Sequence, residues 1–315
     1  MKTLKVCFIG YGSIAKRHIT NLQNLCKDKK IRLSIDVLRH SKVSNEKLDK
    51  SLKYVDLVRY GRLDNDDFYD IIFITNPTSE HYNTLKKYKD NAKMFFLEKP
   101  ACSYADLKKM SRLNIYPNRV YVACPLRYKK VIQYLKNKVN LKNAVSVRAI
   151  CSSYLPDWRK GVDYTKTYSA NKELGGGVRL DLIHEIDYLR YLFGNPVKVI
   201  CKSGKYSKLK INTEDLAVYI LEYKNKIVEV HLDYFGKSNK RELEIYTNSD
   251  VIEVNLIKNK VTYKSNNKIV SFKEKRNDFQ TLELEHFLNI YYGIEKNDNN
   301  LDNSLITLLL TKGIK

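Results

Sequence analysis

The chain has few of the residues that build disulfide scaffolds, zinc sites or flexible linkers. Its six cysteines are scattered over 315 residues and none forms a C-x-x-C pair, so neither a structural zinc site nor a dithiol motif is indicated. Isolated cysteines are typical of a reducing compartment, and we expect a cytoplasmic protein. Only 12 glycines and 6 prolines are present, which argues against a long flexible linker. No run approaches the ~18 apolar residues of a membrane span, so we expect no membrane partner.

Acidic residues are also few compared with basic ones. Asp and Glu total 35, Lys and Arg total 57, and the formal net charge is +22. Such an excess favours an anionic partner, for example a phosphorylated small molecule. The basic residues are spread evenly rather than clustered, so a background bias in composition is the alternative explanation, and we do not expect nucleic acid as the main partner.

Strand and helix patterns alternate through the first part of the chain. Short apolar runs predict buried strands at residues 4–10, 31–38, 69–77, 92–100 and 119–125, and all but the second end in Gly or Pro. Helically spaced segments separate them, which predicts a parallel sheet with helices on both faces. From about residue 144 onwards, eight alternating strands predict a large, mainly antiparallel open sheet. We therefore predict an α/β domain at residues 1–123 and an α+β domain at residues 124–315.

The stretch "VCFIGYGSIA" reads Gly10-x-Gly12-x-x-Ala15 at the end of the first strand. The first glycine permits a tight turn, and the second lets the backbone approach a pyrophosphate at a helix N-terminus. A strand before and a helix after are the context that this motif requires. The first domain is therefore predicted to be a Rossmann dinucleotide-binding domain. Its cofactor contacts would come from Gly10, Tyr11, Gly12, Ser13 and Ile14.

The end of the second strand bears on the choice between NAD and NADP. An acidic residue there would bind a ribose 2′-hydroxyl, whereas basic residues would accept a 2′-phosphate. Asp36 falls inside the predicted strand, and the strand ends in Arg39, His40 and Ser41. This cluster favours NADP over NAD, with a solvated loop in a lysine-rich protein as the alternative.

With this loop, "TNPTSEH", "EKP" and "GGGVRLDLIHEID" in order, the chain resembles the Gfo/Idh/MocA oxidoreductases over its whole length. The resemblance implies a nicotinamide-binding Rossmann domain, then a domain whose open sheet carries substrate and often the oligomer interface. It implies hydride transfer at a sugar or polyol carbon. In that pattern Lys99 is catalytic and His184 is the acid/base. The positions that match cofactor-lining ones are Asn76, Pro77, His81, Glu98 and Lys99.

Two departures from the family pattern stand out. Asp181 lies three residues before His184, where many members have an acidic residue four before the histidine. Its role as third catalytic residue is therefore weighed against Asp187, three residues after His184. The chain also stops sooner, at "SLITLLLTKGIK", than is usual for the family's last helix, so we expect either a short last helix or a truncated chain.

Residue chemistry supports His184 independently of the resemblance. On one continuous helix, Leu182, Ile186, Leu189 and Phe193 would form an apolar stripe, and His184 would point away from it. An imidazole can give or take a proton near neutral pH. "HEIDYL" is not the zinc motif H-E-x-x-H, so we predict no metal.

The long segment at residues 152–177 holds the only tryptophan and is the candidate substrate loop. Aromatic side chains there could stack on a sugar, and basic ones could bind a carboxylate or phosphate. The candidate substrate-binding residues are Arg127, Tyr154, Trp158, Arg159, Tyr164 and Asp187.

The sequence thus predicts an NAD(P)-dependent dehydrogenase or reductase acting on CH–OH groups of a sugar, polyol or nucleotide sugar, and we expect a role in polysaccharide synthesis. A homodimer or homotetramer through the C-terminal sheet is expected. Two alternatives stay open: an NAD-dependent glycoside hydrolase on the same fold, and a non-catalytic nucleotide- or nucleic-acid-binding protein.

Overall fold

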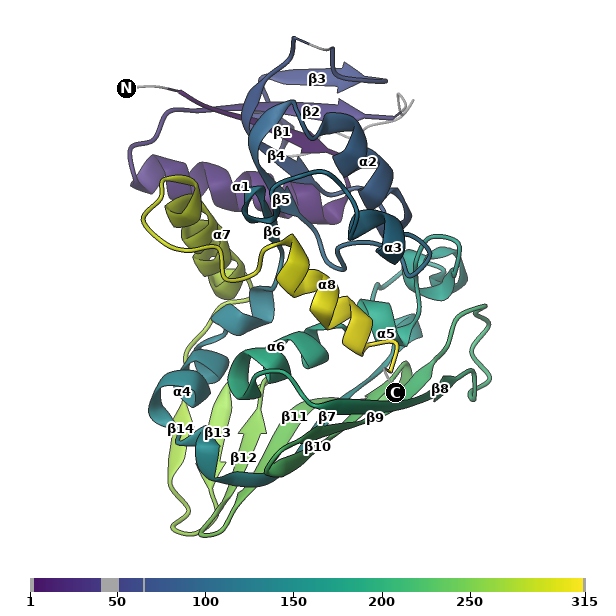
Figure 1. The fold of residues 1–315 in the computed structure, drawn as a ribbon, viewed down its shortest axis with the longest axis vertical. Coiled ribbons are helices and arrows are strands. Elements are labelled where there is room, and N and C mark those ends of the chain that lie inside the picture. The colour runs from purple at the N-terminus through teal and green to yellow at the C-terminus, as the bar shows by residue number, and fades with distance from the viewer. Residues whose placement is uncertain (1–2, 41–50, 65, 314–315) are drawn as a thin grey trace. The chain divides into compact units, whose positions relative to one another are not determined.

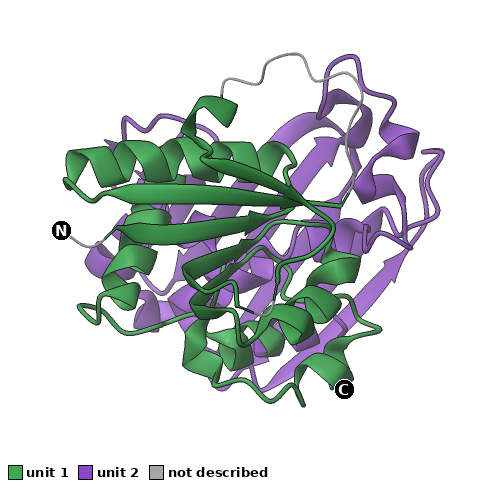
Figure 2. Ribbon diagram, turned by 90° about the horizontal axis from the view of Figure 1, so that it is seen from above, with its two compact units in different colours: residues 1–123, 280–305 green, residues 124–279, 306–315 purple. Residues whose placement is uncertain are grey.

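A computed structural model of the chain describes residues 3–40, 51–64 and 66–313. It divides into two compact units (Figure 2), the first made of residues 1–123 and 280–305 and the second of residues 124–279 and 306–315. The chain thus crosses between units near residue 123, as the sequence predicts, but residues 280–305 return to the first unit. The predicted single domain at 124–315 is incorrect in this respect. Within the described residues, no helix is long and apolar enough to span a bilayer.

The first unit contains a six-stranded parallel sheet in the order β3-β2-β1-β4-β5-β6, drawn at the top of Figure 1. The central strands β1 (Leu4–Ile9), β4 (Tyr69–Ile74) and β5 (Ala92–Leu97) are almost wholly buried, as expected for apolar runs covered on both faces. The strands β2 (Leu33–Arg39) and β6 (Val120–Val122) flank them. The helices include α1 (Ser13–Asp28), α2 (His81–Tyr88), α3 (Leu107–Met110) and α7 (Asp278–Tyr291).

The strand β3 (Leu57–Tyr60) was not predicted from the sequence. It pairs in parallel with β2 at the edge of the sheet. It is only four residues long and its side chains are exposed or half-buried, so it has neither the length nor the apolar run that identifies the central strands.

The second unit contains an eight-stranded sheet in the order β14-β13-β12-β11-β7-β10-β9-β8. All eight predicted strands are present: β7 (Ala144–Tyr154), β8 (Lys198–Gly204), β9 (Leu216–Tyr223), β10 (Lys226–Asp233), β11 (Phe235–Thr247), β12 (Val251–Asn255), β13 (Lys260–Tyr263) and β14 (Ile269–Ser271). The pair β7–β10 is parallel and the other pairs are antiparallel. The fold class predicted from the sequence is therefore confirmed.

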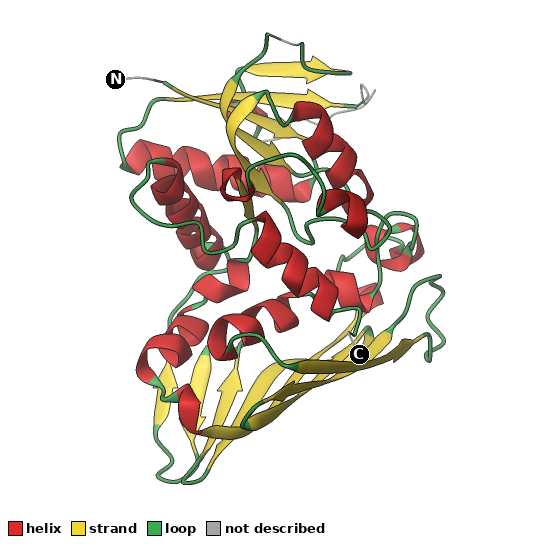
Figure 3. Cartoon of the chain, viewed as in Figure 1, coloured by secondary structure: helices red, strands yellow, loops and turns green. Residues whose placement is uncertain are grey.

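Helices of the second unit cover one face of this sheet (Figure 3). The helices α4 (Lys130–Lys138), α5 (Val178–Asp181) and α6 (His184–Phe193) supply apolar side chains to a core shared with the inward residues of the strands. The last helix, α8, spans Leu301–Leu310. Side chains alternate between buried and exposed along β9 and β10, as they must when one sheet face packs and the other does not.

Candidate functional site

The turn from β1 into α1 depends on two glycines in different ways. Gly10 has a φ of +92°, and a Cβ on it would lie 2.8 Å from the Asn76 backbone nitrogen, so no other residue fits. Gly12 is the N-cap of α1 and makes no side-chain cap hydrogen bond, and a Cβ on Gly12 would meet nothing within 4 Å. An uncapped helix start beside open space is the feature that binds a pyrophosphate.

A cleft of about 490 Å³ opens beside this turn. It is lined by Ile9, Gly10, Leu38, Arg39, His40, Gly61, Asn76, Pro77, Glu80, Asn83, Thr84, Lys87 and Tyr88. Five of the predicted cofactor residues are therefore together in one cleft of the first unit. The other predicted loop residues continue into α1, and Ser41 lies outside the described residues.

The Asn76 side chain has a buried acceptor that a bound dinucleotide could satisfy. Its amide nitrogen donates to the Thr84 hydroxyl at 2.7 Å, whereas its Oδ1 is buried without a hydrogen-bond partner in the described structure. A buried amide oxygen of this kind normally has a donor, and a bound cofactor would offer one.

The end of β2 carries positive rather than negative charge. The Asp36 carboxylate is engaged inside the unit, where it accepts from the Tyr69 hydroxyl at 2.7 Å and lies 3.8 Å from Arg59 Nε. Arg39, the last residue of the strand, places its guanidinium 5.5 Å from the centre of the Tyr11 ring. The Tyr11 hydroxyl in turn lies 2.6 Å from Ser51 Oγ.

The Lys99 turn, residues 98–100, follows β5. It lies at the carboxyl edge of the sheet, as the turn after β1 does. Glu98 Oε1 lies 2.6 Å from His18 Nε2, and its other oxygen accepts from the Lys99 backbone N–H at 3.3 Å. The peptide bond between Lys99 and Pro100 is cis. Burial alone would raise the pKa of Glu98, but the hydrogen bond from His18 and the nearby positive charges lower it overall.

His81 holds the other side of this turn. Its ring is 1% exposed, with Nδ1 2.9 Å from the Pro100 carbonyl and Nε2 3.0 Å from the Asn76 carbonyl. Burial lowers the pKa of His81. Glu98 and His81, predicted to line the cofactor, thus contact the Lys99 turn. His18 was not predicted as a functional residue, because in the sequence it is only one of the inward positions of a helix.

In the second unit, two of the three glycines at residues 175–177 lie tightly against neighbouring parts of the same unit. A Cβ on Gly176 would lie 2.1 Å from the Tyr168 carbonyl oxygen, and one on Gly177, at φ +114°, would lie 2.7 Å from the Glu214 carboxylate. Packing within the second unit therefore requires glycine at residues 176 and 177. They make room for neighbouring backbone and for Glu214.

The predicted continuous helix after the glycines is two helices. α5 ends at Asp181 and α6 begins at His184, because Leu182 leaves helical geometry at φ −96° and ψ 25°. Leu182 and Ile183 are 5% and 4% exposed, so the break lets two consecutive side chains enter the core. It also places His184, which is half-buried, at the start of a new helix.

The Asp181 carboxylate is held by two hydroxyl groups. One oxygen accepts from Ser169 Oγ at 2.5 Å and from the Tyr234 hydroxyl at 3.1 Å. Burial raises the pKa of Tyr234 well above its ordinary value, so this hydroxyl stays protonated and donates.

Asp187 pairs with Arg127. Its two oxygens accept from Arg127 Nε at 2.9 Å and from Arg127 Nη2 at 2.6 Å. Arg127 is 4% exposed and Asp187 is 7% exposed. A buried bidentate pair engages both side chains, and substrate binding by either of them stays a prediction.

The candidate substrate loop brings three of its predicted residues together. Trp158, Arg159 and Tyr164 share a crevice with Ser169, the residue that donates to Asp181. The crevice has a volume of only about 10 Å³, which is room for one water, so a sugar would have to lie over it. Trp158 is 37% exposed and meets the Tyr234 ring edge-on at 5.3 Å. Tyr154 does not line this crevice, and the Lys237 amine lies 3.0 Å from its ring centre.

Across residues 3–40, 51–64 and 66–313, no group of three or more His, Cys, Asp or Glu side chains is arranged to hold a metal ion.

Comparison with known proteins gives consistent matches over both units. The sequence model of an oxidoreductase family with an NAD-binding Rossmann fold matches residues 4–123, and that of the GFO/IDH/MocA C-terminal domain matches residues 133–253. The uncharacterized oxidoreductase YrbE of Bacillus subtilis is 23% identical over 236 residues, which cover 73% of this chain and 66% of YrbE.

Solved structures share the fold at low identity. An NAD-binding oxidoreductase from Klebsiella pneumoniae superposes with a TM-score of 0.80 at 13% identity, covering 99% of this chain and 96% of that one. The WlbA dehydrogenase from Bordetella pertussis, solved with NADH and UDP-GlcNAcA, gives 0.76 at 16% identity, covering 99% and 95%. With both of its domains matched by the family's sequence models, the chain belongs to the Gfo/Idh/MocA family of oxidoreductases, and its first unit is the NAD-binding Rossmann domain.

Proposed function

We propose that the protein is an NAD(P)-dependent oxidoreductase that interconverts a secondary alcohol and a ketone on a sugar, polyol or nucleotide sugar. One observation carries this proposal. The phosphate-binding turn after β1 and the Lys99 turn after β5 lie at the same carboxyl edge of one parallel sheet, where open α/β sheets bind their ligands.

His184 and Lys99 have different proposed roles in this reaction. When bound, the nicotinamide supplies or accepts the hydride. His184 takes the hydroxyl proton in the oxidative direction and returns it in the reductive direction. The Lys99 ammonium stabilises the negative charge that develops on the reacting oxygen. Since Asp187 is bound to Arg127, Asp181 is the better candidate for the third residue of this set.

NADP is the proposed cofactor, although the WlbA structure contains NADH. Arg39 ends β2 beside the cleft, and the nearest acidic residue in that strand, Asp36, is engaged with Tyr69 and Arg59. A guanidinium at this position matches a 2′-phosphate. Arg39→Ala is expected to weaken NADPH binding about tenfold or more while leaving NADH binding nearly unchanged. Fluorescence titration with both nucleotides measures this, and an equal effect on both would refute the preference.

An anionic substrate, such as a nucleotide sugar, fits the second unit. The segments 155–174 and 205–215 are joined by hydrogen bonds, including Lys172 N–H to Asn212 Oδ1 at 2.8 Å and Lys210 N–H to the Tyr164 hydroxyl at 3.1 Å. Their exposed basic residues include Arg159, Lys160, Lys166, Lys172, Lys208 and Lys210, which outnumber the exposed acidic residues Asp157, Asp163 and Glu173. Such an excess of positive charge attracts phosphate or carboxylate groups.

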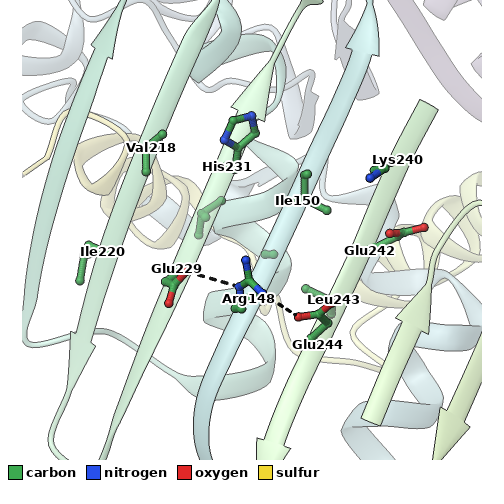
Figure 4. A pocket seen from close by; sticks show the side chains of 12 residues that line it. Arg148, Ile150, Val218, Ile220, Glu229, His231, Lys240, Glu242, Leu243 and Glu244 are labelled. Atoms are coloured by element: carbon green, nitrogen blue, oxygen red, sulfur yellow. Dashed lines mark hydrogen bonds and ion pairs between the residues drawn. The ribbon is translucent and has the colours of Figure 1, made fainter. Parts of the chain in front are cut away.

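The helix-free face of the eight-stranded sheet is the proposed subunit interface. A shallow hollow of about 380 Å³ lies on it, and Figure 4 shows Arg148 between Glu229 and Glu244, from which it lies 3.5 and 3.3 Å. Val218 on β9 and Ile227 on β10 are 37% and 40% exposed. We expect a homodimer or homotetramer by light scattering, and Val218→Glu with Ile227→Glu to dissociate it. A wild-type monomer at micromolar concentration would refute this interface.

The reaction itself is tested by mixing the protein with NADP or NAD and a panel of sugars, polyols and nucleotide sugars. Formation or loss of reduced nicotinamide, followed by absorbance, is the expected result. Retention of bound NAD through purification with glycoside cleavage and no net redox change would indicate the hydrolase alternative. Cofactor binding without turnover on any panel member would count against the proposal.

A further inference from the structure

We propose that His18 is a positioning residue for Lys99. It holds the carboxylate that in turn holds the backbone of the Lys99 turn. This inference rests on the proposed catalytic function of Lys99, but its geometry lies entirely within the first unit.

The buried His18 ring is positioned to hydrogen-bond the Glu98 carboxylate. It is 1% exposed in the middle of α1, and its ring packs edge-on against Phe96 at 5.1 Å. Nε2 lies 2.6 Å from Glu98 Oε1, whereas Nδ1 is buried without a partner among the described residues. The neutral imidazole with its proton on Nε2 satisfies this arrangement, because it donates to the carboxylate and leaves only an acceptor without a partner. A histidine placed purely for packing would not need to meet a carboxylate at this distance.

Glu98 connects His18 to the backbone of Lys99. Its second oxygen accepts from the Lys99 backbone N–H at 3.3 Å. On the other side, His81 Nδ1 lies 2.9 Å from the carbonyl of Pro100, the residue after Lys99. The backbone is therefore held immediately before and immediately after the residue whose amine would stabilise the reacting oxygen.

The helix that carries His18, α1, also begins at the glycine turn after β1. His18 lies six residues after Gly12, which is about 9 Å along a helix. One rigid element thus carries the phosphate-binding N-terminus and the anchor of the Lys99 turn. This arrangement fixes the position of Lys99 relative to the pyrophosphate site, which is the kind of pre-organisation that hydride transfer requires.

The test compares two substitutions of His18. His18→Gln keeps an N–H donor near Glu98, whereas His18→Phe removes the donor and keeps an apolar ring. Ile19→Val is the control, because it perturbs the buried face of the same helix without touching Glu98. Hydrogen exchange of peptides containing Lys99, cofactor titration and steady-state kinetics are measured for all three variants.

The expected result is specific to the turn. His18→Phe speeds exchange of the Lys99 amide while β1 and β4 keep their protection, cofactor affinity stays within about twofold, and kcat falls about a hundredfold, as for a misplaced catalytic group. His18→Gln recovers most of the protection and of kcat, and Ile19→Val behaves like the wild type. If His18→Phe does not fold, Glu98→Leu removes the same hydrogen bonds together with the buried charge, and it should show the same exchange at Lys99.

Unchanged exchange at Lys99 in a folded His18→Phe or Glu98→Leu protein would overturn the inference. A failure of the proposed function is distinguishable from this outcome. In that case Lys99→Ala would keep full turnover, whereas the exchange experiment would still report whether His18 holds the turn.

Discussion

Two glycines of the functional stretches are needed for opposite physical reasons. Gly176 has no space, since a Cβ would lie 2.1 Å from a carbonyl oxygen of the same unit. Gly12 has open space around it, and what a side chain there would obstruct is a ligand. A glycine in a motif therefore has to be assigned to folding or to binding from its surroundings rather than from its sequence context.

This difference gives a paired prediction. Gly176→Ala is expected to destabilise the fold by about 1–3 kcal/mol through overpacking, as measured by urea unfolding. Gly12→Ala is expected to keep the unfolding midpoint but to weaken cofactor binding about tenfold. Loss of stability in Gly12→Ala with unchanged binding would reverse these assignments.

The buried pair of Arg127 and Asp187 is the second case at this scale. Arg127→Ala leaves the Asp187 carboxylate buried without its bidentate partner, so we expect a loss of about 3–5 kcal/mol in the free energy of unfolding. Lys109→Ala is the matched control, because Lys109 makes its ion pair with Asp106 from a side chain that is 61% exposed and lies outside the proposed interface, so it should leave the stability nearly unchanged. Equal effects of the two variants would show that the Arg127 pair is not what stabilises α6.

At the scale of elements, a histidine on α7 fastens the loop that leads to α8. His286 Nε2 lies 3.0 Å from Asp298 Oδ1, and Nδ1 is hydrogen-bonded to Glu295. Burial alone would lower the pKa of His286, but the two carboxylates raise it overall. The loop is therefore tied most strongly when the imidazole is protonated.

The sign of the pH dependence follows from this raised pKa. A group whose pKa is higher in the folded state stabilises the protein fully below its unfolded pKa, and that contribution disappears as the pH rises through the folded pKa. His286→Gln should therefore lower the thermal midpoint more at about pH 5.5 than at about pH 8.5, because the contribution of the protonated imidazole disappears as the pH rises through its raised pKa. A larger effect at the alkaline pH would contradict the ion-pair geometry.

Elements differ in how well the sequence predicts them. The central strands of both sheets are apparent because their apolar runs or alternations are long. Edge strand β3 is short and half-exposed, and no local signal marks it. The break at Leu182 is also hidden, because the helical pattern continues through it and only tertiary packing of Leu182 and Ile183 interrupts the helix.

At the scale of the whole molecule, order along the chain predicts the two sheets but not which unit the C-terminal segment joins. Residues 280–305 return to the first unit, and such long-range contacts have no signature in local periodicity. The site shows the same limit. The glycine turn, Lys99 and His184 follow from motifs, whereas His18 and the Arg127–Asp187 pair are visible only once α1 and α6 are packed.

The proposed reaction depends most directly on His184 as the acid/base. The decisive measurement is kcat of His184→Ala on a substrate that the wild type turns over, with cofactor binding checked by titration. We predict a loss of about 10²–10⁴ in kcat with cofactor affinity unchanged. Full turnover by His184→Ala would show that the central assignment is wrong.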